Sequence, residues 1–125
     1  MSYVLVVDDN PLNANLARIV LSRAGHEVDT AGGAREALAR VATRRPDVVV
    51  TDISMPEVSG TDLCHELRTL YGGTPLRIVA YTALAMREEI DAITDAGFDA
   101  VVIKPATKES LLAAVRAAPA MEQTS

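Results

Sequence analysis

Short apolar segments with strand character alternate with segments of helical spacing along the whole chain. The first, residues 4–7, is apolar at every position and ends at the polar run Asp8-Asp9-Asn10-Pro11, as is typical of a strand buried in a parallel sheet. Further strands are predicted at residues 27–30, 47–51, 76–80 and 98–103, each followed by a predicted helix. Five such units in succession predict an α/β fold with helices on both faces of a parallel sheet.

The predicted helices are defined by their ends and by apolar residues at helical spacing. Asn10 and Pro11 fit the N-cap and first position of a helix that ends at Gly25. Residues 44–46 break the second helix, and residues 72–73 close the third. The apolar faces are expected to comprise Leu12, Leu16, Ile19 and Val20; Ala34, Ala37, Leu38 and Val41; Leu63, Leu67 and Leu70; Met86, Ile90 and Ile93; and Leu111, Leu112 and Val115.

Composition limits the class of protein. A length of 125 residues with a hydrophobic fraction of 49% suits one domain with its own core. The single cysteine, Cys64, cannot form an internal disulfide, which fits a reducing cytoplasm, and its default role is a packed core thiol. No apolar stretch reaches membrane length, and the net charge of −5 argues against nucleic-acid binding. We expect a cytoplasmic domain at residues 1–117 and a short flexible tail at 118–125.

Polar side chains follow four of the predicted strands. Asp8 and Asp9 follow the first strand, Asp52 the third, Thr82 the fourth and Lys104 the fifth. Ligands of open α/β sheets bind beyond the carboxyl ends of the strands. We therefore expect these five residues to converge on one rim of the sheet.

Three carboxylates at one rim repel one another unless a cation lies among them. Oxygen ligands without His or Cys favour Mg²⁺. Lys104 offers a positive charge and Thr82 a hydrogen-bond donor for a phosphoryl group, and Asp52 is the expected nucleophile, since carboxylates form acyl phosphates. Taken singly, each residue also fits a turn, a helix cap or a loop dipeptide. Their joint occurrence after four strands favours a common site.

Four blocks of the chain resemble the response-regulator receiver family of two-component signalling. They are residues 6–10, VVDDN; residues 51–60, TDISMPEVSG; Thr82-Ala83; and Lys104-Pro105. The match runs from about Val4 to Arg116, which is nearly the whole chain. The resemblance implies a flavodoxin-like (βα)5 doubly wound parallel sheet with strand order 2-1-3-4-5.

The resemblance also implies a role for each site residue. Asp52 would be the phosphoacceptor, and Asp9 and Asp52 would ligate Mg²⁺ directly. Asp8 would act through a metal-bound water, and the backbone carbonyl of Ser54 would complete the protein ligands. Two further residues, Thr82 and Lys104, would bind phosphoryl oxygens. A cis peptide bond is implied between Lys104 and Pro105.

The implied partners are a histidine kinase or histidine phosphotransfer protein as donor and a downstream protein that the sequence does not identify. The donor is expected to dock over the first helix and the loop after the fifth strand, with Leu12, Asn13, Leu16 and Pro105 as candidate contacts. Both a free-standing receiver and one excised from a longer protein, such as a hybrid histidine kinase, fit the sequence. Met1 slightly favours the free-standing case.

Two positions depart from the family pattern. Val101 lies three residues before Lys104, where many receivers carry Tyr or Phe, so the usual aromatic read-out of phosphorylation is in doubt. Leu84 lies two residues after Thr82, where polar residues often help admit water, and an apolar side chain there favours slower hydrolysis of the acyl phosphate.

Two other function classes share the fold. A phosphatase with an aspartyl nucleophile typically needs a second Asp two residues after it, where this chain has Ser54. A flavin- or nucleotide-binding module needs a phosphate loop after the first strand, where Asp8 and Asp9 would repel the ligand. We therefore expect no turnover enzyme but a phosphoacceptor switch that assists its own phosphorylation and dephosphorylation.

Overall fold

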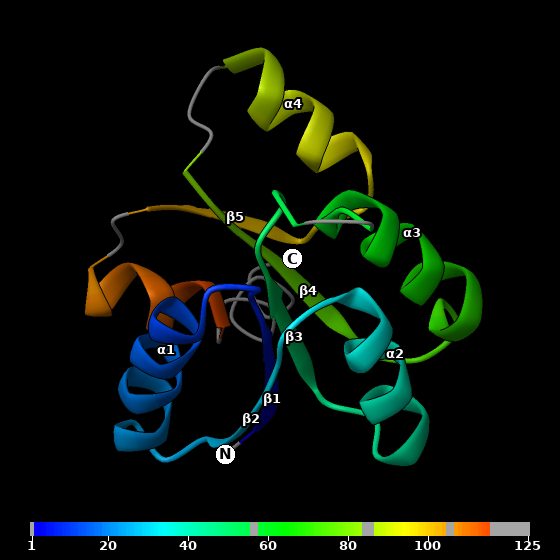
Figure 1. Ribbon diagram of the computed structural model, residues 1–125. Helices are drawn as coiled ribbons and strands as arrows, with labels where there is room; N and C mark the ends of the chain where they lie inside the picture. The colour runs from blue at the N-terminus through cyan, green and yellow to red at the C-terminus, as the bar shows by residue number, and fades with distance from the viewer. Residues whose placement is uncertain (1, 56–57, 84–86, 105–106, 116–125) are drawn as a thin grey trace, which may run out of the picture.

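The computed structural model describes residues 2–55, 58–83, 87–104 and 107–115. It contains one parallel five-stranded sheet in the order β2-β1-β3-β4-β5 (Figure 1). The strands are β1 (Tyr3–Val7), β2 (Glu27–Ala31), β3 (Val48–Thr51), β4 (Arg77–Thr82) and β5 (Ala100–Ile103). The helices are α1 (Pro11–Arg23), α2 (Ala34–Thr43), α3 (Gly60–Tyr71), α4 (Arg87–Asp95) and a last helix at residues 108–115. The predicted fold class and strand order are confirmed.

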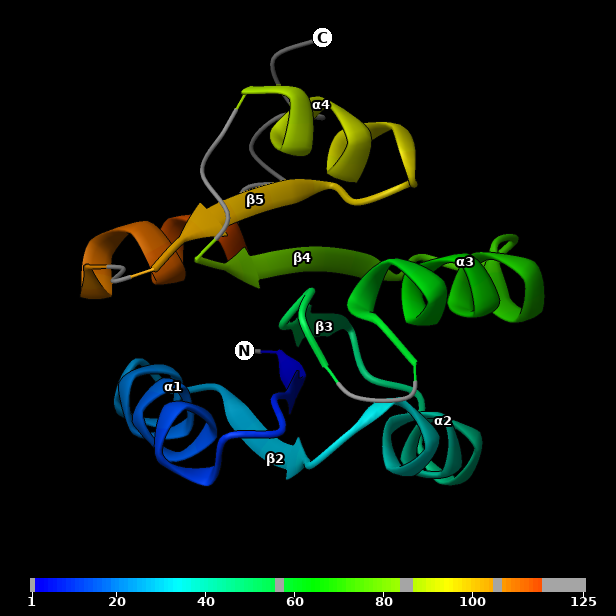
Figure 2. The same cartoon turned by 45° about the horizontal axis from the view of Figure 1, so that its top comes forward.

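Helices cover both faces of the sheet, as Figure 2 shows. One face, here called the α1 face, packs against α1 and the helix at 108–115, and the opposite face packs against α2, α3 and α4. Alternate residues of a strand point to opposite faces, so Val4 and Val6 of β1 join the core of the α1 face while Leu5 and Val7 join the other. β1 is therefore apolar on both sides, as its sequence predicts.

The buried side of α1 differs from the prediction. Leu12 and Leu16 are 66% and 52% exposed, and the side chains that face the sheet are Ala14, Ala17 and Leu21. These three residues share one side of a helix with 3.6 residues per turn, and the two alanines let α1 lie close to the strands. The expected inward position of Leu70 on α3 is likewise wrong, since this side chain is 57% exposed.

Strand and helix ends agree with the prediction to within a few residues. Asn10 caps α1 as expected, because its Oδ1 accepts hydrogen bonds from the backbone N–H groups of Leu12 and Asn13 at 3.0 and 3.3 Å. The fourth strand is longer than predicted and ends at Thr82 itself. Cys64 is a buried core thiol, as predicted, and burial raises its pKa to about 11.

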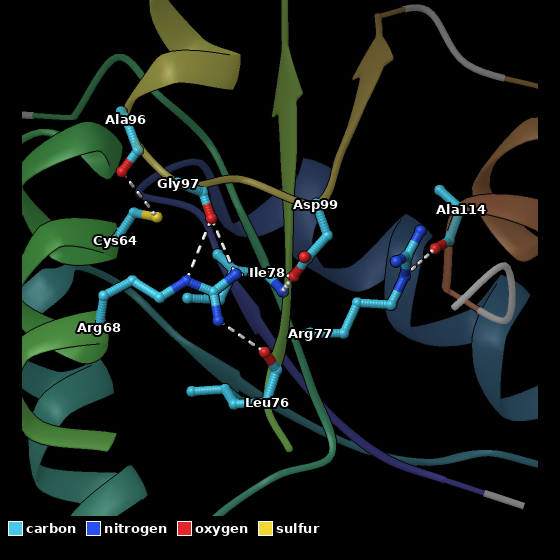
Figure 3. Close-up of polar contacts among 9 residues, drawn as sticks. All are labelled: Cys64, Arg68, Leu76, Arg77, Ile78, Ala96, Gly97, Asp99 and Ala114. Atoms are coloured by element: carbon cyan, nitrogen blue, oxygen red, sulfur yellow. Dashed lines mark hydrogen bonds and ion pairs between the residues drawn. The ribbon is translucent and has the colours of Figure 1, made fainter. Parts of the chain in front are cut away.

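Arg68 of α3 makes polar contacts with the segments before β4 and before β5 (Figure 3). Its guanidinium donates to the carbonyl of Leu76 at 2.8 Å and to that of Gly97 at 2.8 and 3.1 Å. It also pairs at 2.7 Å with Asp99, whose carboxylate accepts the N–H of Ile78 at 2.8 Å. This cluster joins α3 to the start of β4 and to the turn before β5.

We expect Arg68→Ala to lower the free energy of unfolding by about 2 kcal/mol, because two backbone carbonyls and one carboxylate lose a charged donor. Urea unfolding measures the change. Arg23→Ala is the matched control, since this exposed arginine lies at the end of α1, and it should change stability by less than about 0.5 kcal/mol. Equal losses in the two variants would contradict the structural role of Arg68.

Candidate functional site

Backbone pairing brings the predicted site residues to one edge of the sheet. Val7 pairs with Thr51 and Thr51 with Ala80 across β1, β3 and β4, and Thr82 pairs with Ile103 across β4 and β5. The next residues of the chain continue this hydrogen bonding, since the N–H of Asp52 donates to the carbonyl of Val7 at 2.9 Å. The carboxyl ends of β1, β3, β4 and β5 therefore meet where the sequence predicts.

The acidic side chains form a compact cluster. Asp8, Asp9 and Asp52 each offer one carboxylate oxygen, and these three oxygens lie within 4.8 Å of one another. Asp8 and Asp52 are 2% and 9% exposed, whereas Asp9 is exposed. Two of the carboxylates are therefore buried and the third is exposed, so the cluster is accessible to solvent on the side of Asp9.

Lys104 connects the two buried carboxylates. Its Nζ lies 3.1 Å from Oδ2 of Asp8 and 3.5 Å from Oδ2 of Asp52, and its side chain is only 16% exposed. The N–H of Lys104 donates to the carbonyl of Thr82 at 2.8 Å, which fixes its backbone beside β4. Thr82 is buried at the same edge. All five predicted residues thus lie at one rim.

Burial and neighbouring charges shift two pKa values in the cluster. Burial raises the pKa of Asp52, and the nearby charge of Asp8 raises it further, while the ammonium of Lys104 opposes both effects. Burial by itself would lower the pKa of Lys104, but hydrogen bonding to Asp8 and the charge of Asp52 outweigh it and raise the pKa. The lysine therefore stays charged, and it favours the ionised form of Asp52.

The loop after β3 holds Asp52 from the side of α3. The N–H of Ser54 donates to Oδ1 of Asp52 at 3.3 Å, and the N–H of Gly60 donates to the carbonyl of Ile53 at 2.9 Å. A Cβ at Gly60 would lie 2.1 Å from the backbone oxygen of Asp52. The sequence places Gly60 in a family motif but does not reveal this close approach, since it depends on how α3 meets the end of β3.

The donor set fits a small divalent cation. Carboxylate oxygens without sulfur or imidazole suit Mg²⁺, and the spacing within the cluster allows the three oxygens to share one ion. Several predictions lie outside the described residues: the cis Lys104–Pro105 bond, the docking role of Pro105, the effect of Leu84, the inward position of Met86, and the tail at 118–125.

Known proteins share this fold and sequence pattern. A family model, the response regulator receiver domain, matches residues 4–116. The chain is 41% identical to the response regulator MprA of Mycolicibacterium vanbaalenii and 38% identical to TcrX of Mycobacterium tuberculosis, a probable transcriptional regulatory protein. Each match covers 91% of this chain and 48% of the relative, so the chain spans about half the length of these curated relatives. A solved structure of the Vibrio cholerae chemotaxis protein CheY4 superposes with a TM-score of 0.86 and 31% identity, covering 94% of this chain and 98% of that one.

The doubly wound sheet and the acidic cluster at its carboxyl edge define the protein as a receiver of two-component signalling. The chain belongs to the response regulator receiver domain family. No helix among the residues that the structure describes is both long and apolar enough to span a membrane.

Proposed function

We propose that Asp52 accepts a phosphoryl group from a histidine kinase or histidine phosphotransfer protein, that the reaction requires Mg²⁺, and that phosphorylation switches a protein–protein interaction. The ion pairs of Lys104 with Asp8 and Asp52, within the acidic cluster, are the main support for this proposal. This arrangement combines a carboxylate nucleophile, oxygen ligands for a cation and a fixed positive charge for phosphoryl oxygens.

The residues act mainly through position and charge. Asp52 forms the new bond from a carboxylate oxygen to phosphorus as the phosphorus–nitrogen bond of the donor phosphohistidine breaks. The bonding electrons go to the donor imidazole, which takes up a proton from solvent. Lys104 is close enough to Asp52 to turn toward the incoming oxygens. Asp8, Asp9, Asp52 and the carbonyl of Ser54 would hold Mg²⁺, and Thr82 would donate a hydrogen bond. When bound, Mg²⁺ neutralises charge on the carboxylates and the phosphoryl oxygens.

The same residues favour a switch over a turnover enzyme. Ser54 stands two residues after Asp52, at the position where an aspartyl phosphatase carries its second acid. We infer that the domain is a phosphoacceptor that contributes to its own phosphorylation and dephosphorylation. We further propose that it acts in the cytoplasm, where histidine kinases find ATP. The family match at residues 4–116 supports a receiver domain over the proposed range 1–117.

Phosphoryl mapping tests the proposal. The purified chain is incubated with acetyl phosphate and Mg²⁺, the acyl phosphate is reduced with borohydride, and the modified peptide is identified by mass spectrometry. We expect one modified residue, Asp52, and no labelling when EDTA replaces Mg²⁺. Modification of another residue, or equal labelling with EDTA, would overturn the assignment.

The metal assignment predicts a specific loss. Asp9→Asn should weaken Mg²⁺ binding at least about tenfold, because one of three carboxylates loses its charge, and it should slow phosphorylation from acetyl phosphate. Thermal unfolding at increasing Mg²⁺ concentrations measures the affinity. Glu66→Gln is the control with the same charge change on the exposed surface of α3. A Mg²⁺ response of Asp9→Asn equal to that of the control would count against Asp9 as a ligand.

The exposed leucines of α1 support docking of the phosphodonor at this helix. Leu12 and Leu16 lie on α1 near the acidic rim, and more than half of each apolar side chain is exposed to solvent. We expect the double variant L12A/L16A to slow phosphotransfer from a partner protein about tenfold or more. Labelling by acetyl phosphate should stay unchanged, because this donor needs no docking. Unaltered partner phosphotransfer would exclude these two contacts.

A further inference from the structure

The ammonium of Lys104 contacts an aromatic ring as well as two carboxylates. Its Nζ lies 4.8 Å from the centroid of the Tyr81 ring, in addition to its ion pairs with Asp8 and Asp52. A cation over an aromatic face is attracted to it, and more strongly where water is excluded. The lysine side chain is only 16% exposed, so its contact with the ring is largely shielded from water.

Tyr81 lies on the α1 face of the sheet. It packs against the core that contains Val79 and Val102. It also lines a surface groove between α1 and the helix at 108–115, together with Leu16, Val20 and Leu111. The Tyr81 ring thus contacts Lys104 of the charged site and also lines the groove, which Lys104 lines as well. Leu16, whose exposure marks it as a docking candidate, lies in that groove.

The usual aromatic position lies on the opposite face. Val101, three residues before Lys104, packs with the core that contains Ala80 and Ile78 and is covered by α2, α3 and α4. An aliphatic side chain at that position offers no ring to report on the site. Tyr81 and Val101 lie on neighbouring strands, but they face opposite sides of the sheet.

We propose that Tyr81 is a positioning residue for Lys104 and that it links the phosphorylation state of Asp52 to the groove between α1 and the helix at 108–115. This inference rests on the proposed phosphorylation of Asp52. A phosphoryl group adds roughly two negative charges at neutral pH, so Lys104 should shift from Asp8 toward the new oxygens. Its distance from the Tyr81 ring then changes, and the ring moves against the side chains that line the groove. The read-out therefore occurs on the α1 face.

The NMR signals of the tyrosine rings test the link between Asp52 phosphorylation and Tyr81 directly. The chain has three tyrosines and no tryptophan, so a protein carrying ring-¹³C tyrosine gives few aromatic signals, and Tyr81→Phe assigns the one of interest. Mg²⁺ and beryllofluoride mimic phosphorylation. We expect them to shift the Tyr81 signal, while the signals of Tyr3 and Tyr71 stay in place, because these residues lie toward the amino ends of the strands. Asp52→Asn should abolish the shift.

Two substitutions separate positioning from packing. Tyr81→Leu removes the ring but keeps an apolar side chain, and it should slow phosphorylation from acetyl phosphate about two- to fivefold, the effect of one cation–π contact. Tyr81→Phe keeps the ring and should restore the wild-type rate. Equal rates in all three proteins, or a slowing shared by both variants, would overturn the positioning role.

The outcomes also distinguish failure of the Tyr81 link from failure of the proposed phosphoacceptor function. If beryllofluoride shifts the backbone amide signal of Thr82 in the wild-type protein but leaves the Tyr81 ring signal in place, the link is wrong and the phosphoacceptor assignment stands. If neither signal shifts and acetyl phosphate does not label Asp52, the proposed function itself fails.

Discussion

Asp52→Asn is expected to abolish phosphorylation altogether. Asparagine is nearly the same size as aspartate, so the hydrogen bond from the Ser54 N–H and the buried position are retained. Its amide oxygen is a far weaker nucleophile than a carboxylate, and one of the cluster's negative charges is lost. Acetyl phosphate with Mg²⁺ should leave the variant unlabelled, as measured by mass spectrometry of the intact chain. A labelled Asp52→Asn protein would show that another residue accepts the phosphoryl group.

The same substitution should stabilise the metal-free domain. Burial, with the charge of Asp8, raises the pKa of Asp52 above its ordinary 3.8. A raised pKa means that the folded state binds the proton more tightly than the unfolded state, so stability from this group is present below pH 3.8 and is lost as the pH rises through the folded-state pKa. At neutral pH the ionised carboxylate therefore costs stability that asparagine does not.

Thermal unfolding in EDTA measures this effect. At pH 7 Asp52→Asn should melt above the wild type, and the difference should shrink as the pH falls toward 3.8. Mg²⁺ should then raise the melting temperature of the wild type more than that of the variant. Glu66→Gln, an exposed change of the same charge, controls for net charge. A melting temperature below that of the wild type would show that the ion pair with Lys104 outweighs the cost of burial.

The fold was predictable because each strand carries its signal locally. Val48, Val49 and Val50 are apolar at consecutive positions, which suits a strand covered on both sides, and their burial confirms it. The rim was predictable for a related reason. Parallel strands end at the same edge, so polar residues that follow them meet there regardless of the loop details. Asp8 and Lys104 are far apart in the sequence but lie 3.1 Å apart in the structure.

Other features depend on how the elements pack, and the sequence does not reveal them. Arg77 reads as an ordinary charged residue, yet it is buried, and its Nε donates to the carbonyl of Ala114 at 2.6 Å (Figure 3). The inner side of α1 was misplaced because spacing alone does not distinguish the buried alanines, Ala14 and Ala17, from leucines that remain exposed. The contact between Tyr81 and Lys104 likewise requires knowing which face each side chain occupies.

Gly60→Ala should have the largest effect on stability among the changes that leave the charges in place. The added Cβ would lie 2.1 Å from the backbone oxygen of Asp52 and 2.9 Å from the Cα of Ile53. Both neighbours are backbone atoms, so no side chain can turn away to make room. The start of α3 and the end of β3 must separate, and the hydrogen bond from Gly60 to Ile53 lengthens or breaks. We expect a loss of about 3 kcal/mol or more, measured by urea unfolding.

The same substitution should also impair the site, because the displaced oxygen belongs to the phosphoacceptor itself. A shift of about 1 Å in a reacting group costs roughly a hundredfold in rate, so the fraction of Gly60→Ala that remains folded should be labelled far more slowly than the wild type. Gly33→Ala is the matched control. Gly33 is the N-cap of α2, as Gly60 is the first residue of α3, and its φ of −178° is extended. Its added Cβ meets nothing within 4 Å. That variant should keep its labelling rate and lose no more than about 1 kcal/mol of stability, because alanine is a poorer N-cap than glycine. If Gly60→Ala behaves like Gly33→Ala, the close packing of α3 on the Asp52 backbone does not hold the phosphoacceptor in place.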